Sequence, residues 1–539
     1  MKKTIVYTTD GRQTEILNAA IYSAHKFIPD AEIVVLTQTN KLANRIYDKS
    51  VRIENISRLL TELGYSELGY GFRRHAFGAF FKLLVPLVDS LKDLEQVLVL
   101  DSDILIHGSQ FAQLFTYEAL PDSEASAAAD INGSSDRIGK VFSRISSKAV
   151  NDDVLAKVWE GKNAFSNQVY VNQGVMLWYP ASIDKEFYRR RLDAYYKNEH
   201  VFEFAECDFV NAFMRIDRGI PAMFHAYDSG ENEEHKEFAV HYILEGKVKM
   251  HIKAVEMGFD PCQDVERVVV YESDGGDQAR LRGSLWSMRR IMGRGTKVYI
   301  LTSRANADDF PHGRELQKTF DVQFIHVSDT LLSELGLNLD SWRLKWPFAV
   351  MYKMLLPFIP ELAKHHNVLH LDTDTVVASP EALNLFRLPT EGLECHGAKD
   401  ISDPETKNFI PGNAPKVMLS DIYNEMVSRV WSTHSLACKE YINVGVVVFH
   451  LDEIRKDLDW YSQRLQWGFD GINRGIYRCP EQDVTNWFLT VGLLNPKYNR
   501  FSYEVGYDLY KRGFILHYAS GRKRVMAGQL GALGYTGID

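Results

Sequence analysis

The sequence lacks several features that would place it in a common class of protein. No apolar run reaches the length of about 18 residues that crosses a bilayer, and the N-terminus meets Thr8 and Asp10 before an apolar leader could form. Basic charge is not in excess, since the formal net charge is −9, so nucleic acid is not an expected partner. No Gly-x4-Gly-Lys-Ser/Thr segment is present, which argues against a P-loop nucleotidase. We expect a cytoplasmic protein without a membrane span, in the host cytoplasm if the chain is viral.

Cysteine is also scarce, with five residues in a chain of 539. They are widely spaced and form no C-x-x-C pair, so the sequence predicts neither a zinc site nor a redox-active pair, and a reducing compartment fits best. Hydrophobic residues make up 45% of the chain and aromatic residues 12%, which is ample for packed cores. The length exceeds what a single core usually supports, so we expect two or more domains.

What the sequence does contain is one pattern written twice. The segment IVYTTDG, which ends at Gly11, resembles VVYESDG, which ends at Gly275. Further matches follow in the same order at a nearly constant separation: Lys82 with Lys353, Asp101 with Asp372, Asp103 with Asp374, Asn172 with Asn443, Gly174 with Gly445, Asp208 with Asp483, Asn211 with Asn486 and His241 with His517. Such a repeat predicts two tandem domains of one fold, over residues 1–262 and 263–539.

Each copy alternates short apolar runs with helix-like stretches. In the first copy, runs at 4–7, 33–36 and 97–100 predict strands, and the segment 14–28 predicts a helix. Continuously apolar strands that alternate with helices are typical of an α/β fold with a mainly parallel sheet covered on both faces. Ligands of such sheets bind at the carboxyl ends of the strands, which is where an acidic pair falls in each copy.

The acidic pairs are Asp101 with Asp103 and Asp372 with Asp374, and each follows an apolar run. Buried charges persist when they are paired or bind a metal, and two carboxylates at a strand end can share one hard cation. A third Asp-x-Asp, at Asp457, has no apolar strand before it and no partner in the other half, so we interpret it as a solvated helix face. The recurrence of the other two pairs favours two metal sites.

His241 and His517 are candidates for a third protein ligand, because each comes late in its copy, just after an apolar run, and each precedes a tyrosine. An imidazole combined with carboxylates favours Mn²⁺ modestly over Mg²⁺. The alternative is that both histidines serve only the packing of their copy.

The ordered set of motifs resembles the metal-dependent GT-A glycosyltransferases. The set comprises the apolar strand into Asp-x-Asp, the Asn-x-Gly before an apolar strand, the Glu-x-Asp-x-x-Asn box and the late histidine. It is most similar to the retaining family 8 type, which includes glycogenin and bacterial lipopolysaccharide galactosyltransferases, and it covers both copies nearly end to end. The resemblance implies two GT-A (Rossmann-like) domains, a nucleotide-sugar donor that is usually a UDP-sugar, a divalent ion on its diphosphate, and a glycan or glycoconjugate acceptor.

Site residues follow from the resemblance by matching position. The metal ligands would be Asp101, Asp103, His241, Asp372, Asp374 and His517. The nucleotide and diphosphate would lie beside Thr8, Thr9, Asp10, Lys82, Ser102, Glu272, Ser273, Asp274, Lys353, Thr373 and Lys523. The donor sugar, the acceptor and the reaction centre would lie beside Asn172, Asn443, Asp208, Glu481, Gln482 and Asp483. For the basic run that contains Lys523, a solvated C-terminal loop is an equally weighted alternative to a diphosphate contact.

Three departures and alternatives accompany this hypothesis. The Pro-Trp that follows the family's late histidine is missing in both copies, which leaves the diphosphate contacts of that loop open. Cys207 stands where the second copy has Gln482, so the first copy either uses another sugar, is the weaker catalyst, or only binds sugar or nucleotide. A remote alternative is a phosphohydrolase, because residues 372–376 also spell Asp-x-Asp-x-Val, although the motif lies about a hundred residues into its copy instead of on the first strand. We expect a bifunctional enzyme with two active sites.

Overall fold

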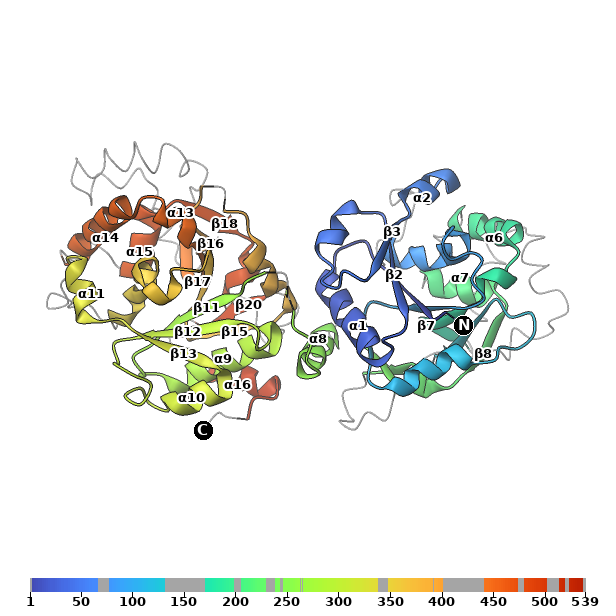
Figure 1. The fold of residues 1–539 in the computed structure, drawn as a ribbon, viewed down its shortest axis with the longest axis horizontal. Helices are drawn as coiled ribbons and strands as arrows, with labels where there is room; N and C mark the ends of the chain where they lie inside the picture. Colours follow the sequence, from blue (N-terminus) through green and yellow to red (C-terminus); the bar gives the residue numbers. More distant parts are fainter. Residues whose placement is uncertain are drawn as a thin grey trace. The chain divides into compact units, whose positions relative to one another are not determined.

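The computed structural model describes residues 2–65, 77–130, 170–197, 205–228, 238–242, 246–261, 263, 265–337, 348–390, 392–400, 441–473, 479–501, 513–518 and 523–536. The chain divides into two compact units, Met1–Phe259 (unit 1) and Asp260–Asp539 (unit 2). Figure 1 draws unit 1 from blue to green and unit 2 from green to red. The sequence placed the domain boundary after residue 262, close to the junction of these units.

Unit 1 is built on a seven-stranded sheet in the order β3-β2-β1-β4-β7-β6-β8. Strand β7 runs antiparallel to both of its neighbours, and the other pairs are parallel. The bounds are β1 Thr4–Thr8, β2 Glu32–Thr37, β3 Arg52–Asn55, β4 Val97–Leu100, β6 Ala125–Ala129, β7 Val171–Trp178 and β8 Ile216–Ile220. The sheet is therefore mainly parallel, as predicted, with one reversed strand that the sequence did not predict.

A second, three-stranded sheet completes unit 1 in the order β5-β10-β9. Its strands are β5 Ile104–Ile106, β9 Ala226–Tyr227 and β10 Ala239–His241. Because β5 follows β4 after only three residues, the chain passes from the middle of the large sheet directly into the small one at Asp101–Asp103.

The two faces of the large sheet carry separate cores, because successive side chains of a strand point to opposite faces. In β1, Val6 belongs to the core that contains side chains of α6 and α7, whereas Ile5 and Tyr7 belong to the core that contains α1, α8 and the small sheet. Helix α1 matches the predicted 14–28 and is buried along most of its length, since β5 and α8 pack against it. The helices are α1 Thr14–Phe27, α2 Ser57–Leu63, α3 Phe77–Phe80, α6 Lys185–Lys197, α7 Ala205–Phe213 and α8 Gly246–Glu256.

Unit 2 repeats this topology strand for strand. Its sheets have the orders β13-β12-β11-β14-β17-β16-β18 and β15-β20-β19, and β17 is again the reversed strand. The strands are β11 Val268–Glu272, β12 Lys297–Thr302, β13 Val322–His326, β14 Asn367–Leu371, β15 Thr375–Val377, β16 Cys395–Lys399, β17 Ile442–His450, β18 Val491–Leu494, β19 Arg500–Phe501 and β20 Ile515–His517. The helices are α9 Gln278–Met292, α10 Gly313–Phe320, α11 Asp329–Glu334, α13 Leu451–Arg455, α14 Leu458–Asn473, α15 Pro480–Phe488 and α16 Lys523–Ala532.

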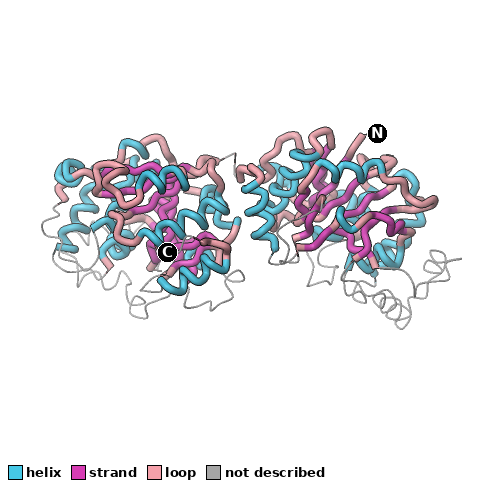
Figure 2. Tube along the Cα trace, turned by 90° about the horizontal axis from the view of Figure 1, so that it is seen from below, coloured by secondary structure: helices cyan, strands magenta, loops and turns pink. Residues whose placement is uncertain are grey.

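Helices flank the strands of each unit in Figure 2, which confirms the predicted α/β class. Within the part of the chain that the structure describes, no helix combines the length and apolarity needed to cross a membrane. A buried arginine–glutamate pair lies beside the large sheet of each unit, Arg191 with Glu124 and Arg464 with Glu394. Both guanidinium groups bind both carboxylate oxygens, which is the geometry that such pairs need when water is excluded.

Candidate functional site

The acidic pair of unit 1 occupies the turn between the two sheets. The backbone N–H of Asp101 donates to the Gly174 carbonyl at 2.9 Å, so Asp101 continues the pairing of β4 with β7. Asp103 directly precedes β5, and β5 pairs with β10 so that Ile104 lies opposite His241. This register brings together side chains that are more than 130 residues apart in the sequence.

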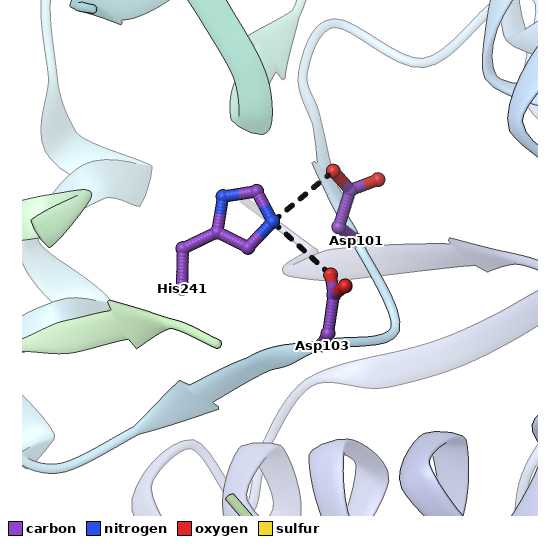
Figure 3. A group of neighbouring side chains, drawn as sticks. All are labelled: Asp101, Asp103 and His241. Carbon is purple, nitrogen blue, oxygen red and sulfur yellow. Dashed lines mark hydrogen bonds and ion pairs between the residues drawn. The ribbon is translucent and has the colours of Figure 1, made fainter. Parts of the chain in front are cut away.

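Figure 3 shows that the His241 ring points at both carboxylates. Its Nε2 lies 3.8 Å from Oδ2 of Asp101 and 3.1 Å from Oδ1 of Asp103. The three potential ligand atoms all lie within 4.8 Å of one another. Two carboxylate oxygens and one imidazole nitrogen form a donor set that suits a divalent ion such as Mn²⁺.

Unit 2 contains the same arrangement. Nε2 of His517 lies 3.7 Å from Oδ2 of Asp372 and 3.3 Å from Oδ1 of Asp374. These three residues also have their ligand atoms within 4.8 Å of one another. Asp457, by contrast, is exposed just before α14, and its carboxylate accepts from the N–H of Trp460, as expected for a solvated helix start.

Glycine in the Asn-x-Gly motif makes room for the histidine. A Cβ on Gly174 would lie 2.8 Å from Nε2 of His225 and 2.8 Å from Nδ1 of His241. A Cβ on Gly445 would lie 2.6 Å from Nδ1 and 2.8 Å from Nε2 of His517. Carbon and nitrogen atoms do not approach this closely. A larger residue at position 174 or 445 would therefore displace the histidine from its place beside the carboxylates.

A cationic side chain contacts the second aspartate of each pair, and the helices that supply it in the two units do not correspond in the repeat. Nζ of Lys247 in α8 lies 3.1 Å from Oδ2 of Asp103, and a guanidinium nitrogen of Arg280 in α9 lies 3.1 Å from Oδ2 of Asp374. Burial alone would raise the pKa of Asp103, but its contacts with His241 and Lys247 hold that pKa below its usual range. The pKa of Asp374 is lowered in the same way by its histidine and arginine. Both carboxylates are therefore ionised and able to bind a cation.

The two predicted lysines, Lys82 and Lys353, are buried against the first aspartate of each pair. Nζ of Lys82 lies 2.5 Å from Oδ1 of Asp101. Nζ of Lys353 lies 3.1 Å from Oδ1 of Asp372 and 2.9 Å from Oε1 of Glu272.

Glu272 has no acidic counterpart in unit 1, where Thr8 occupies its position. Burial raises the pKa of Glu272 to about 8. Its ligand atom also groups with those of His370 and Asp372, but the Lys353 ammonium contacts both carboxylates there.

The ends of the first strands lie next to the acidic turns, because β1 pairs with β4 and β11 pairs with β14. Thr8 and Thr9 are nearly buried, as are Glu272 and Ser273. The Asp274 carboxylate accepts from the N–H and the hydroxyl of Ser303 at 2.7 and 2.8 Å. The corresponding carboxylate of unit 1, on Asp10, accepts from the N–H of Arg12.

The residues predicted at the reaction centre differ in their surroundings. The Asp208 and Asp483 carboxylates accept from the buried hydroxyls of Tyr170 and Tyr441, so both lie in the core beneath the site. Burial raises the pKa of Glu481 to about 7.

The neighbouring amide, Gln482, donates to Asp400 at 2.7 Å and accepts from Nδ2 of Asn443 at 3.0 Å. In unit 1, Asn172 accepts from the N–H of Gly174. Burial raises the pKa of the Cys207 thiol, which replaces the amide, to about 12.

The remaining predicted residues are Ser102 and Thr373, which lie half-buried in the turns between the aspartates, and Lys523, which begins α16. The side chain of Lys523 and the preceding residues 519–522 lie outside the described part. Lys247 was missed, although the repeat contains a signal for it: it follows His241 by six residues, as Lys523 follows His517. Arg280 matches Ile16 in the repeat, so no such signal exists for it.

No protein-family model matches the sequence, and no curated protein matches it either. Among solved structures, the galactosyltransferase LgtC in complex with donor and acceptor sugar analogues is similar to 48% of this chain over 98% of its own, with 16% identity and a TM-score of 0.34. The WbbM bifunctional glycosyltransferase is similar to 96% of this chain over 94% of its own, with 11% identity and a TM-score of 0.33. Mouse xyloside xylosyltransferase 1 is similar to 47% of this chain over 97% of its own, with 16% identity and a TM-score of 0.30.

Proposed function

We propose that the protein is a bifunctional glycosyltransferase in which each unit transfers a sugar from a nucleotide-sugar donor, a UDP-sugar, to a glycan or glycoconjugate acceptor. One observation carries the proposal. Two carboxylates and an imidazole converge at the same seam of the same topology in both units, with nitrogen–oxygen distances of 3.1–3.8 Å. Two carboxylates that converge in a nearly buried turn cost free energy unless they bind a partner such as a cation, and both units keep an imidazole ligand beside them.

The donor set fits a divalent ion, Mn²⁺ or Mg²⁺, in each unit. Three protein ligands leave coordination positions for phosphate oxygens. Such an ion, when bound, stabilises the negative charge that a leaving nucleoside diphosphate develops. Lys247 and Arg280 lie beside these ligands and would add positive charge next to the diphosphate.

The other predicted residues have proposed roles around this centre. The ends of β1 and β11, next to the acidic turns, would hold the nucleoside. The amides of Asn443 and Gln482 would face the donor sugar, with Glu481 at their side. Retention of configuration is proposed from the family resemblance.

Unit 1 has a second candidate function as a binding module. A nucleophilic role for Cys207 is disfavoured because burial raises the pKa of its thiol to about 12, which keeps it protonated. Cys207 stands where unit 2 has the Gln482 amide, so unit 1 lacks that amide. A unit that binds the donor without transferring its sugar would not need that amide.

A phosphohydrolase would require Asp372 as nucleophile and a protonated Asp374 as acid. Burial would favour the protonated form of Asp374, but His517 and Arg280 lower its pKa instead. The arrangement thus favours two ionised ligands over a nucleophile and an acid.

Donor hydrolysis by the full-length protein tests the proposal. With Mn²⁺ and a panel of nucleotide sugars, Asp101→Asn and Asp372→Asn should each remove the turnover of one unit. If only Asp372→Asn reduces turnover, unit 1 is a binding module. If neither substitution changes turnover, the metal-dependent function is wrong.

A further inference from the structure

A row of buried amides leads away from the histidine of unit 2. Nδ1 of His517 lies 3.0 Å from Oδ1 of Asn499, and Nδ2 of Asn499 lies 2.9 Å from Oδ1 of Asn443. Nδ2 of Asn443 lies 3.0 Å from Oε1 of Gln482, whose Nε2 lies 2.7 Å from the Asp400 carboxylate. All five side chains belong to residues that are at most 8% exposed.

The chemistry of these groups fixes the direction of every hydrogen bond in the row. The Asp400 carboxylate accepts, so the amide of Gln482 donates to it and presents its oxygen to Asn443. The backbone N–H of Gly445 donates to the same Oδ1 of Asn443 at 2.9 Å, which independently identifies that atom as the oxygen. Asn499 must then donate to Asn443 and present its own oxygen to the histidine.

An amide oxygen cannot donate, so Nδ1 of His517 carries the hydrogen. In the neutral ring, Nε2 then has the free electron pair, and Nε2 is the atom that faces Asp372 and Asp374. Asn499 therefore selects the tautomer that binds a cation. An acceptor behind a ligating histidine typically changes metal affinity by about 10- to 100-fold.

In unit 1, the side chain behind the histidine does not select one tautomer. His225 occupies the place of Asn499, at the start of the short strand that pairs with β10, and its Nε2 lies 3.1 Å from Nδ1 of His241. An imidazole nitrogen can either donate or accept, so this contact allows both tautomers of His241. Cys207 replaces Gln482, and among the residues that the structure describes no group hydrogen-bonds to the buried Nδ1 of His225, so nothing there orders this ring from behind.

We propose that Asn499 is a positioning residue that holds His517 in its metal-binding tautomer, and that unit 2 consequently binds the divalent ion more tightly than unit 1. The inference rests on the proposed metal-dependent function.

Mn²⁺ titrations of full-length protein, followed by the electron paramagnetic resonance signal of free Mn²⁺, test this assignment. Asp101→Asn with Asp103→Asn isolates the site of unit 2. On this background, Asn499→Leu should weaken Mn²⁺ binding by about 10- to 100-fold. Asn499→His, which copies unit 1 with a polar side chain, guards against a folding defect and should weaken it in the same direction.

Gln482→Leu is the matched control, because it removes an amide from the same row two links further from His517. The N–H of Gly445 still orients Asn443, so Mn²⁺ affinity should stay within about twofold of the background. In the reverse background, Asp372→Asn with Asp374→Asn, His225→Asn should tighten Mn²⁺ binding. Thermal unfolding of each variant verifies its fold.

Two results separate the two hypotheses. If neither parent background binds Mn²⁺, the proposed function fails, and this inference with it. If the parents bind Mn²⁺ but both Asn499 variants bind it as tightly as their parent, only the role of Asn499 is refuted.

Discussion

Replacing Gly445 by alanine should disable the metal site of unit 2 at a modest cost in stability. The added Cβ would lie 2.6 and 2.8 Å from the two ring nitrogens of His517, whereas such atoms pack at about 3.5 Å. Cε1 of the same ring would lie closer still, so the ring must move by more than about 1 Å. It is, however, buried and stacked on Phe501 at a centroid distance of 5.2 Å. Overpacking of this kind costs about 1–3 kcal/mol. A misplacement near 1 Å costs about 100-fold in rate.

Two measurements on Gly445→Ala check this reasoning. Urea unfolding should show the loss of stability, and Mn²⁺-dependent donor hydrolysis in the Asp101→Asn background should fall by about 100-fold. Gly528→Ala is the matched control, since no atom lies within 4 Å of its added Cβ inside α16. It should stabilise the protein by up to about 1 kcal/mol. Unchanged stability together with unchanged Mn²⁺-dependent donor hydrolysis in Gly445→Ala would show that His517 does not lie against β17.

Two further predictions concern the core of unit 2. Burial lowers the pKa of His450, which contacts His396, to about 4. In the unfolded chain the His450 ring takes up a proton near pH 6.5, whereas in the folded protein it stays neutral down to about pH 4. The free energy of unfolding should therefore fall by about 3 kcal/mol between pH 6.5 and pH 4. The double variant His396→Ser, His450→Tyr should reduce this dependence of the free energy of unfolding on pH, as measured by urea titrations. An unchanged dependence on pH would contradict a neutral buried His450 ring. Arg464→Met should cost about 3–5 kcal/mol, because it leaves the Glu394 carboxylate buried without its partner. Arg58→Met, which breaks an exposed pair, should leave the urea midpoint unchanged, and equal effects of the two variants would refute the argument.

The sequence predicted the fold class because strand burial leaves a direct pattern. Runs such as 97–100 are apolar at every position, and the structure buries them on both faces. It could not predict the reversal of β7, because strand direction depends on pairing partners that are distant in sequence. Asn172 and Gly174 were recognised as a motif, but only the packing of His241 explains the glycine.

The candidate site was predictable where the repeat supplied two examples of each residue. Asp101, Asp103 and His241 each have a counterpart in unit 2, and the register of β5 with β10 brings them together. Side-chain direction within helices was not predictable. Asp208 shares its motif with residues of the site, yet it points at Tyr170, because packing of α7 against β7 decides which face is buried.

The place of each acidic turn has a mechanical consequence. Asp101 directly follows β4 of the seven-stranded sheet, whereas Asp103 directly precedes β5 and His241 ends β10 of the three-stranded sheet. An ion held by all three would cross-link the two sheets, so its binding energy would resist their separation, by about 2.7 kcal/mol at a hundred times the dissociation constant. Hydrogen exchange should then slow in β10 on adding Mn²⁺, while the interior of β2 stays as it was.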